Sequence, residues 1–419
     1  MRHFSCRLAF LVAMMVARAL IAPSHLVAQQ PADQLSVVDR VVVATRIYAT
    51  IQQYFAHWDG VPRPEVEAAY HQYIDSAVRA TVRKDFDLAT LRFIAKLRNG
   101  HTQFFDSQLD GRALKFRLLP IEGQWVVVNT QDSQLLRGAV VRSLDGQPVD
   151  DFVRERAQYV AASNDRLALT HVFSYPGLFP ERVSVGLQNG DVVVDRAVRI
   201  EARETSTSPA SEGRWLRESR TAYVRVSSFG DPNYERTALE LVRQFGAAQN
   251  LIVDVRGNGG GTTPGQLIRA LMNRPWRTWQ EVTPQRIALF EAQGFPPMQA
   301  SRVSRPQSPA ADAYGGHIFL LVDRFCGSAC EDFVMPFKDT GRAVIIGETT
   351  QGSSGNPYRT DLGFSMSIAV GAVRYTFPDG TAFEGVGIVP NVAIERKLSD
   401  IIAGRDVVLE RAQDLAGAP

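Results

Sequence analysis

Hydrophobic residues recur at helical spacing in the first part of the chain. Residues 35–55 form one long stretch rich in apolar positions, and apolar residues between 66 and 78 are spaced three and four apart, as on one face of an α-helix. A third apolar stretch, 88–97, precedes Asn99-Gly100, a pair typical of a helix C-terminus. The pattern predicts an N-terminal helical domain over residues 29–105.

Short alternating apolar runs replace this pattern farther along the chain. Four valine-rich runs predict strands, and Asp145-Gly146 and Asn189-Gly190 predict the turns that join strands. One helix is expected over residues 149–162. The valine-rich runs lie at 126–128, 139–141, 183–185 and 192–194. We therefore expect a β-rich domain over residues 118–202.

Strands and helices alternate between residues 210 and 400. The predicted strands are 223–227, 251–255, 318–322 and 344–346, and the predicted helices are 234–248, 330–340 and one that opens at Pro264. This alternation indicates an α/β core with mostly parallel strands. Ligand sites in such sheets lie beyond the carboxyl ends of the strands, so the loops after Val255 and Val322 are the places to search for chemistry. We expect residues 401–419 to form a C-terminal tail.

The first 28 residues have the features of a secretory signal peptide. Arg2 and Arg7 precede an apolar segment, residues 8–17, and a small-residue cleavage site ends at Ala28. An uncleaved anchor is the alternative, but Arg18 leaves the apolar run well short of the ~20 residues that a membrane span needs. We expect export to a periplasmic or extracellular space, with no transmembrane span after removal of the signal.

Composition narrows the class of protein. The chain has 419 residues, of which 45% are hydrophobic and 21% charged, which excludes fibrous, low-complexity and wholly disordered proteins. The formal charge of +2 includes three leader arginines, so no basic excess remains for binding nucleic acid.

Only two cysteines, Cys326 and Cys330, follow the leader, and two are too few for a disulfide scaffold. We expect them to pack as small buried residues; a disulfide between them is the alternative.

Two loops of the predicted α/β core carry candidate chemistry. The first, residues 254–261, ends in three glycines and is either a tight turn or an oxyanion-binding loop, because it lacks the lysine of a phosphate loop. The second places Ser328 between a strand and a helix, as a nucleophile or as a helix N-cap.

Two classes of hydrolase are excluded by the order and kind of residues. All seven histidines precede Ser328, which excludes the α/β-hydrolase order of catalytic residues. No metal-ligand motif occurs, so we expect neither metal nor cofactor.

A hydroxyl nucleophile needs a base and an acid to orient that base. Lys338 lies ten residues past Ser328 along a helix, roughly 15 Å away, which is too far. His101, in a loop, is the best base, although a lone histidine is also compatible with a structural role. Glu384 precedes a glycine-rich segment and is the candidate acid; an exposed loop carboxylate is its alternative.

Four ordered blocks between residues 35 and 395 resemble those of the S41 peptidases, the superfamily of the C-terminal processing protease, tricorn and interphotoreceptor retinoid-binding protein. The blocks are Asn99-Gly100-His101-Thr102, Asp254-Val255-Arg256-Gly257-Asn258-Gly259-Gly260-Gly261, Ser328-Ala329-Cys330-Glu331 with Ile346-Gly347-Glu348-Thr349-Thr350-Gln351-Gly352, and Glu384-Gly385-Val386-Gly387-Ile388-Val389-Pro390-Asn391. The resemblance implies a ClpP/crotonase-like α/β core, an inserted PDZ-like domain that captures a peptide C-terminus by strand addition, and the family's N-terminal helical domain.

The resemblance also implies residue roles. Ser328 is the nucleophile, and the N–H groups of Gly260 and Ala329 are the oxyanion donors. In the Ser–Lys branch of the family the base is a lysine about 25 residues after the nucleophile, but Ser353 stands there. The chain therefore resembles the tricorn-like branch, in which His101 is the general base and Glu384 orients it.

In that branch an additional catalytic serine stands at the position that Gly100 occupies here. The function implied by the resemblance is an exported serine endopeptidase that hydrolyses peptides or unfolded proteins through an acyl-enzyme. The alternative is a catalytically weak or inactive S41-fold protein that binds a peptide or an apolar ligand, as the retinoid-binding branch does. An esterase or amidase shares the same triad and differs only in its pocket.

Overall fold

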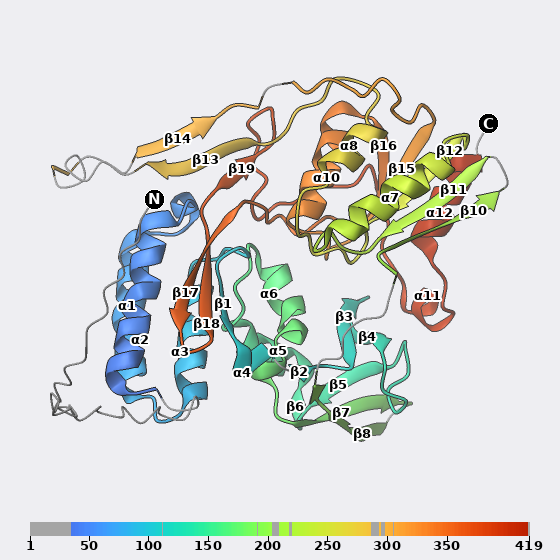
Figure 1. Cartoon of the computed structure of the whole chain (residues 1–419). Helices are drawn as coiled ribbons and strands as arrows, with labels where there is room; N and C mark the ends of the chain where they lie inside the picture. Colours follow the sequence, from blue (N-terminus) through green and yellow to red (C-terminus); the bar gives the residue numbers. More distant parts are fainter. Residues whose placement is uncertain are drawn as a thin grey trace, which may run out of the picture.

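Helices cover the faces of several β-sheets in the computed structural model (Figure 1). It describes residues 35–417 apart from residues 111, 191, 203–208, 218–219, 286–292, 295–297 and 305. The predicted signal peptide, residues 1–28, lies outside the described residues. Within the described ranges, no helix combines the length and the apolar character that crossing a membrane requires.

A six-stranded sheet forms the centre of the C-terminal half. Its strand order is β10-β11-β12-β15-β16-β20, and every pair is parallel except β10 with β11. The strands are β10 Ser211–Arg217, β11 Thr221–Val226, β12 Asn250–Asp254, β15 His317–Val322, β16 Ala343–Gly347 and β20 Val392–Ala393. The predicted α/β core with mostly parallel strands is confirmed.

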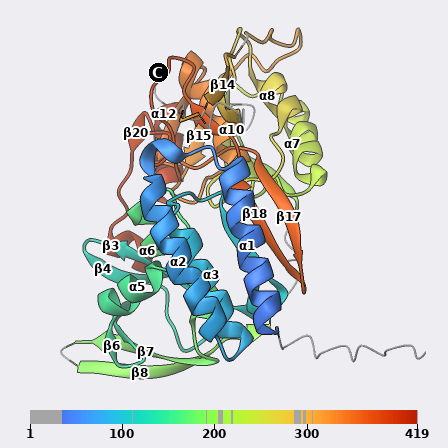
Figure 2. The ribbon, with the colours of Figure 1, turned by 90° about the vertical axis from the view of Figure 1, so that its left-hand side faces the viewer.

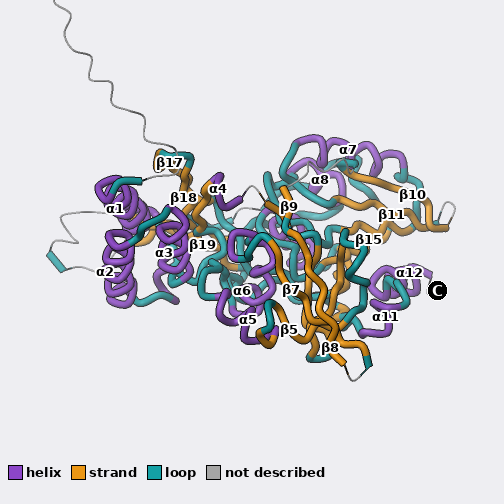
Figure 3. The backbone as a smooth tube through the Cα atoms, turned by 90° about the horizontal axis from the view of Figure 1, so that it is seen from below, coloured by secondary structure: helices purple, strands orange, loops and turns teal. Residues whose placement is uncertain are grey.

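Helices bury both faces of this sheet (Figure 3). Alternate residues of one strand point to opposite faces. Leu320 of β15 therefore joins the core under α7, α8 and α10, while its neighbour Leu321 packs with Val408 of α12. The helices are α7 Pro232–Gln244, α8 Gly265–Leu271, α10 Ala329–Thr340, α11 Leu398–Ile402 and α12 Val407–Gly417. Burial on both faces explains why the central strands β12, β15 and β16 are mostly apolar.

Three N-terminal helices pack against a separate antiparallel sheet (Figure 2). The helices are α1 Val37–Tyr54, α2 Arg63–Arg79 and α3 Arg83–Ala95, and the strands, in sheet order, are β1 Gln103–Asp106, β18 Met366–Gly371 and β17 Pro357–Gly363. The three predicted helices are confirmed, but α3 begins five residues earlier than predicted and ends four residues before Asn99. The pairing of β1 with β18 joins segments more than 250 residues apart in the chain.

The β-rich segment between these parts has its own apolar core. Its elements are β3 Phe116–Ile121, β4 Gln124–Thr130, β5 Val140–Leu144, β6 Gln147–Pro148, α5 Val149–Ala157, α6 Asp165–His171, β7 Arg182–Asn189 and β8 Val192–Arg199. All four predicted strands are present. The predicted helix 149–162 stops at Ala157, and α6 was not predicted.

The remaining helices, strands and turns are short. They are α4 Ser107–Asp110, β2 Arg112–Ala113, β9 Glu201–Ala202, β13 Gln280–Gln285, β14 Met298–Arg302, β19 Arg374–Thr376 and the 3-10 turns Trp58–Gly60, Val172–Ser174 and Pro176–Leu178. Strands β14, β13 and β19 form a three-stranded antiparallel sheet. This sheet was not predicted.

A buried ion pair spans the loop that carries His101. Arg83, the first residue of α3, donates from Nε to Asp106 Oδ2, the last residue of β1, at 2.8 Å, and the two side chains are 5% and 0% exposed. Arg83 also donates to the carbonyl of Phe364. The pair thus fixes both ends of the segment 83–106 against the β17–β18 hairpin.

We predict that Arg83→Ala lowers the free energy of unfolding by about 3–5 kcal/mol, because it leaves the carboxylate of Asp106 buried without its partner. Urea denaturation followed by circular dichroism measures the change. Arg92→Ala, at an exposed position of the same helix, is the control and is expected to change stability by less than about 0.5 kcal/mol. Equal effects of the two substitutions would show that the buried pair adds nothing.

Candidate active site

Ser328 lies at the junction of β15 and α10 with an unusual backbone conformation. Its φ is 54° and its ψ is −127°, a region that a residue with a side chain adopts only when its surroundings impose it. Ser328 is the N-cap residue of α10 by position, but its side chain makes no capping hydrogen bond. The hydroxyl instead contacts the imidazole of His101, with 3.0 Å between Ser328 Oγ and His101 Nε2.

The loop that carries His101 is held by the buried side chain of Asn99. Asn99 Oδ1 accepts hydrogen bonds from the His101 amide at 3.1 Å and from Thr102 Oγ1 at 3.0 Å. Thr102 Oγ1 in turn accepts from the amide of Gly371 in β18. The imidazole therefore projects from a loop with several fixed points, toward a serine 227 positions later in the chain.

Glu384 does not contact His101 directly. No hydrogen bond or ion pair joins the two side chains in the described part of the chain, which differs from the simple expectation that Glu384 orients the imidazole. Its Oε1 accepts from Asn99 Nδ2 at 2.9 Å and from Ser163 Oγ at 2.6 Å. Ser353 lies between the two groups: its Oγ is 2.9 Å from His101 Nδ1 and 3.5 Å from Glu384 Oε1.

A buried carboxylate on α10 holds the loop of Ser353. Glu331 is 0% exposed and accepts hydrogen bonds from the amides of Gly352 at 2.7 Å and Ser353 at 3.0 Å, and from the hydroxyl of Thr350. The carbonyl of Ser353 accepts from the amide of Ser328 at 2.9 Å. The first turn of α10 therefore positions Ser328 and Ser353 together.

The glycine-rich loop after β12 lies against Ser328. A Cβ built on Gly260, whose φ is 101°, would lie 2.6 Å from Ser328 Cβ and 2.9 Å from the amide nitrogen of Ala329, so only glycine fits there. The Gly260 amide donates to Asn258 Oδ1 at 2.9 Å. The Ala329 amide donates none of the hydrogen bonds found within the described residues.

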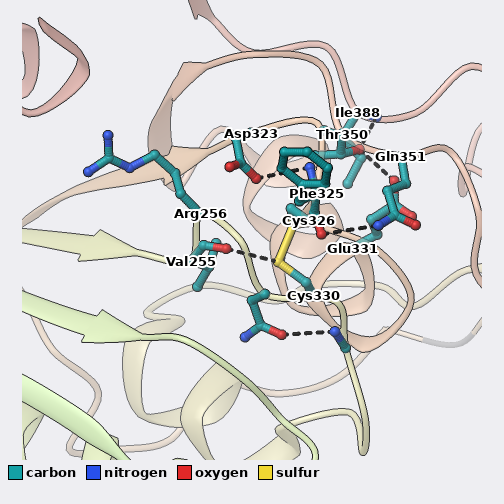
Figure 4. The surroundings of a disulfide bond; sticks show 12 residues. Val255, Arg256, Asp323, Phe325, Cys326, Cys330, Glu331, Thr350, Gln351 and Ile388 are labelled. Atoms are coloured by element: carbon teal, nitrogen blue, oxygen red, sulfur yellow. Dashed lines mark hydrogen bonds between the residues drawn. A yellow bond between two sulfur atoms is a disulfide. The ribbon is translucent and has the colours of Figure 1, made fainter. Parts of the chain in front are cut away.

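Cys326 and Cys330 form a disulfide across the turn that carries Ser328 (Figure 4). Their Cα atoms are 5.4 Å apart and both side chains are fully buried. The expectation that the two cysteines pack as separate small residues was wrong, because the strand-to-helix turn brings their side chains together. The carbonyl of Cys326 accepts from the amide of Gln351, so the turn is also joined to the loop of Ser353.

Burial sets the protonation of the site. It lowers the pKa of His101 to about 4, with a smaller contribution from the charge of Arg359. Burial also raises the pKa of Glu384 to about 7, against the effect of its hydrogen bonds from Ser163 and Asn99. His57, whose Nδ1 lies 4.0 Å from Glu384 Oε1, has a pKa lowered to about 3 by burial and by the neighbouring His101. The imidazole of His101 is therefore neutral at neutral pH.

Sequence reasoning placed Ser328, His101 and Glu384 in one site, and the structure brings all three there. Sequence reasoning did not place Ser353 or Ser163 in the site. Ser353 was noted only because the family's lysine is missing there, and Ser163 belongs to an irregular segment with no motif of its own. Glu331 ends the first segment of the block that begins at Ser328. Its role as a buried hydrogen-bond acceptor could not be predicted, because it depends on the loop that follows β16.

Residues 220–394 match the model of peptidase family S41. A chloroplastic C-terminal processing peptidase of Tetradesmus obliquus is 26% identical over 178 residues, which are 41% of this chain and 35% of that protein. Putative tricorn protease homolog 2 of Streptomyces coelicolor is 24% identical over 311 residues, 73% of this chain and 24% of that protein. The chain thus matches about a third or less of the length of these relatives.

Solved structures share the fold. The structure of mature CPAF complexed with lactacystin superimposes with a TM-score of 0.69 at 14% identity, covering 91% of this chain and 98% of that chain. The photosystem II D1 C-terminal processing protease superimposes with a TM-score of 0.52 at 17% identity, covering 91% of this chain and 97% of that chain. At these identities the likeness establishes the architecture and not the activity.

We predict that His101 stays neutral down to about pH 5 in the folded protein, because its folded pKa is about 4 whereas an imidazole in an unfolded chain titrates near 6.5. The unfolded chain then binds the proton first, so this group lowers the free energy of unfolding as the pH falls from about 6.5 to about 4. Histidine-selective NMR titration measures the pKa, and His101→Gln assigns the resonance. A midpoint near 6.5 in the folded state would contradict the prediction.

Proposed function

On the premise that this chain belongs to peptidase family S41 through residues 220–394, we propose that it is a serine endopeptidase that hydrolyses peptides or unfolded proteins through an acyl-enzyme. One observation carries the proposal: the hydroxyl of Ser328, on a constrained strand-to-helix turn, lies 3.0 Å from the Nε2 atom of His101. A hydroxyl beside a neutral imidazole is the arrangement that activates a serine for nucleophilic attack.

The first half-reaction forms the acyl-enzyme. His101 Nε2 takes the proton of Ser328 as Oγ attacks the substrate carbonyl carbon, and the tetrahedral intermediate carries a negative oxygen. The protonated imidazole then gives this proton to the leaving amine as the peptide C–N bond breaks. In the second half-reaction water attacks the ester carbonyl carbon while His101 takes a proton from the water. The tetrahedral intermediate then collapses: the C–O bond to Ser328 breaks, the new carboxyl group leaves, and His101 gives the proton to Ser328 Oγ.

The oxyanion is assigned to the amides of Ala329 and Gly260. The Ala329 amide lies at the start of α10, where the partial positive charge of a helix N-terminus favours an anion. The Gly260 amide keeps its bond to Asn258 and would share its hydrogen with the oxyanion in a three-centre bond. Removal of one such donor typically costs about 10²–10³ in rate.

The surroundings offer room for a peptide. A cavity of about 1010 Å³ lies beside the glycine-rich loop and α10, and its lining includes Thr263, Trp279, Asp332 and Tyr375. The two aromatic side chains favour an apolar side chain of the substrate. The lining of this cavity includes neither Ser328 nor His101, so we assign the cavity to a part of the substrate away from the scissile bond.

The remaining parts of the proposal concern the whole chain. The tricorn-like assignment rests on His101 as base and on Ser353 where the Ser–Lys branch has lysine. Residues 118–202 are proposed as a PDZ-like domain that captures a peptide C-terminus by adding it to a sheet edge. Asn164, just before α6, donates to the carbonyls of Gln351 and Gly385, so this part of the chain contacts the loops around the site. The leader, residues 1–28, is proposed to direct export.

We predict that Ser328→Ala lowers peptide cleavage by at least ~10⁴-fold, because it removes the nucleophile. The purified mature chain is assayed with a quenched fluorescent peptide library and with a fluorophosphonate probe that reacts with activated serines. Ser107→Ala, at an exposed position in α4, is the control and is expected to keep both activities. Unchanged cleavage by the Ser328 variant would overturn the proposal, and peptide or lipid binding by a wild type that never labels would support the alternative of a binding protein.

A further inference from the structure

We propose that the hydroxyl of Ser353 is the positioning group of His101, linking its Nδ1 to Glu384, and that Gly100 lacks a side chain so that this hydroxyl fits. The inference rests on the proposed function, because it concerns the base of the same site. It assigns a role to a residue 25 positions after Ser328 that neither the motifs nor the comparisons assign.

The direction of the hydrogen bonds follows from the chemistry at Ser328. For His101 Nε2 to accept the serine proton, the proton of the neutral imidazole must lie on Nδ1. Among the described residues, the hydrogen-bond partner of Nδ1 is Ser353 Oγ, at 2.9 Å. A hydroxyl accepts one hydrogen bond and donates another at the same time, so Ser353 accepts from Nδ1 and donates to Glu384 Oε1.

Ser353 is held in place for this role. Its side chain is 1% exposed, its amide donates to Glu331 Oε2 at 3.0 Å, and its carbonyl accepts from the amide of Ser328 at 2.9 Å. Both backbone partners belong to the first turn of α10 or its N-cap. A change in the position of the nucleophile would therefore move Ser353 with it and preserve the spacing between them.

The space around Gly100 explains why the hydroxyl comes from position 353. A Cβ built on Gly100 would lie 2.8 Å from Ser353 Oγ, 3.3 Å from Ser353 Cβ and 3.5 Å from Ser163 Oγ. A side chain at position 100 and the hydroxyl of Ser353 therefore compete for one volume. Gly100 does not have a positive φ, so its backbone would accept another residue and the limit is steric.

The hydrogen bond from His101 Nδ1 to the hydroxyl of Ser353 becomes stronger as the reaction proceeds. Once His101 is protonated, its Nδ1–H carries positive charge, and hydrogen bonds to charged groups are stronger than neutral ones. The 3.5 Å contact between Ser353 Oγ and Glu384 Oε1 is long in the free protein, and such contacts often tighten only when the charge develops. Loss of a hydrogen bond to a charged group corresponds to about a 10- to 100-fold loss in rate.

The first experiment removes the hydroxyl. We expect Ser353→Ala to lower kcat by about 10- to 100-fold with little change in KM, because the contact gains strength only in the transition state. Histidine-selective ¹⁵N NMR of the same protein is expected to show His101 protonated on Nδ1 in the wild type and to shift toward protonation on Nε2 in the variant. An unchanged kcat together with an unchanged tautomer would overturn the inference.

The second experiment returns the hydroxyl from the opposite side. In a Ser353→Gly background, where both close contacts are relieved, Gly100→Ser is expected to raise kcat at least about tenfold above Gly100→Ala. The alanine variant is the matched control, because it adds the same Cβ without the oxygen. With Ser353 intact, Gly100→Ser is expected to lower kcat, since its Cβ meets Ser353 Oγ. Equal rates for the Gly100→Ser and Gly100→Ala variants in the Ser353→Gly background would refute the inference. They would show that position 100 and Ser353 do not compete for one volume, and that no hydroxyl is needed between His101 and Glu384.

The failure of the inference is distinguishable from the failure of the proposed function. If the wild type neither cleaves peptides nor reacts with fluorophosphonate, the proposed function fails, and the tautomer of His101 still tests the contact with Ser353. If the wild type reacts through Ser328 and the Ser353 variants match it in rate, only the inference fails. Circular dichroism checks that each variant is folded, and the matched pair in the glycine background compares hydroxyl with methyl in one scaffold.

Discussion

The turn at Ser328 is the constraint on which the site depends. Ser328 stands directly before α10 with a φ of 54° and a ψ of −127°, and a residue in such a region typically costs about 1–3 kcal/mol. The surroundings offset this cost. The Ser328 amide donates to Ser353, Gly260 packs against its Cβ, and the disulfide of Cys326 with Cys330 spans it. The hydroxyl is thereby presented to His101.

Buried polar groups connect the parts of the chain that meet at this turn. Glu331 satisfies two amides and a hydroxyl of the 350–353 loop, and burial raises its pKa to about 8. Asn258 donates to Val226 and accepts from Gly260, which joins the glycine-rich loop to β11. Because unpaired polar groups in such places are costly, each of these bonds restricts the loops to one arrangement.

The carboxylate of Glu384 shows how far the site extends beyond the central sheet. Its Oε1 accepts from Asn99 of the N-terminal part and from Ser163 of the β-rich segment, while its Oε2 is buried and has no partner among the described residues. Burial with incomplete pairing keeps its pKa near 7, although carboxylates ordinarily ionise well below that. Three separately packed cores therefore contribute to the environment of one acid.

The sequence alone determined the three N-terminal helices, the parallel strands β11, β12, β15 and β16, and the residues with suitable chemistry, because these follow from local periodicity and from short motifs. Ser328, His101 and Glu384 were identified in this way. Only the tertiary structure decided how they meet. It placed Ser353 between His101 and Glu384, paired Cys326 with Cys330, and built the β14–β13–β19 sheet. The place of Ser353 and the three-stranded sheet depend on the approach of segments separated by tens to hundreds of residues, on which local patterns carry no information. The disulfide joins cysteines only four residues apart, but it depends on the backbone conformation of the turn before α10.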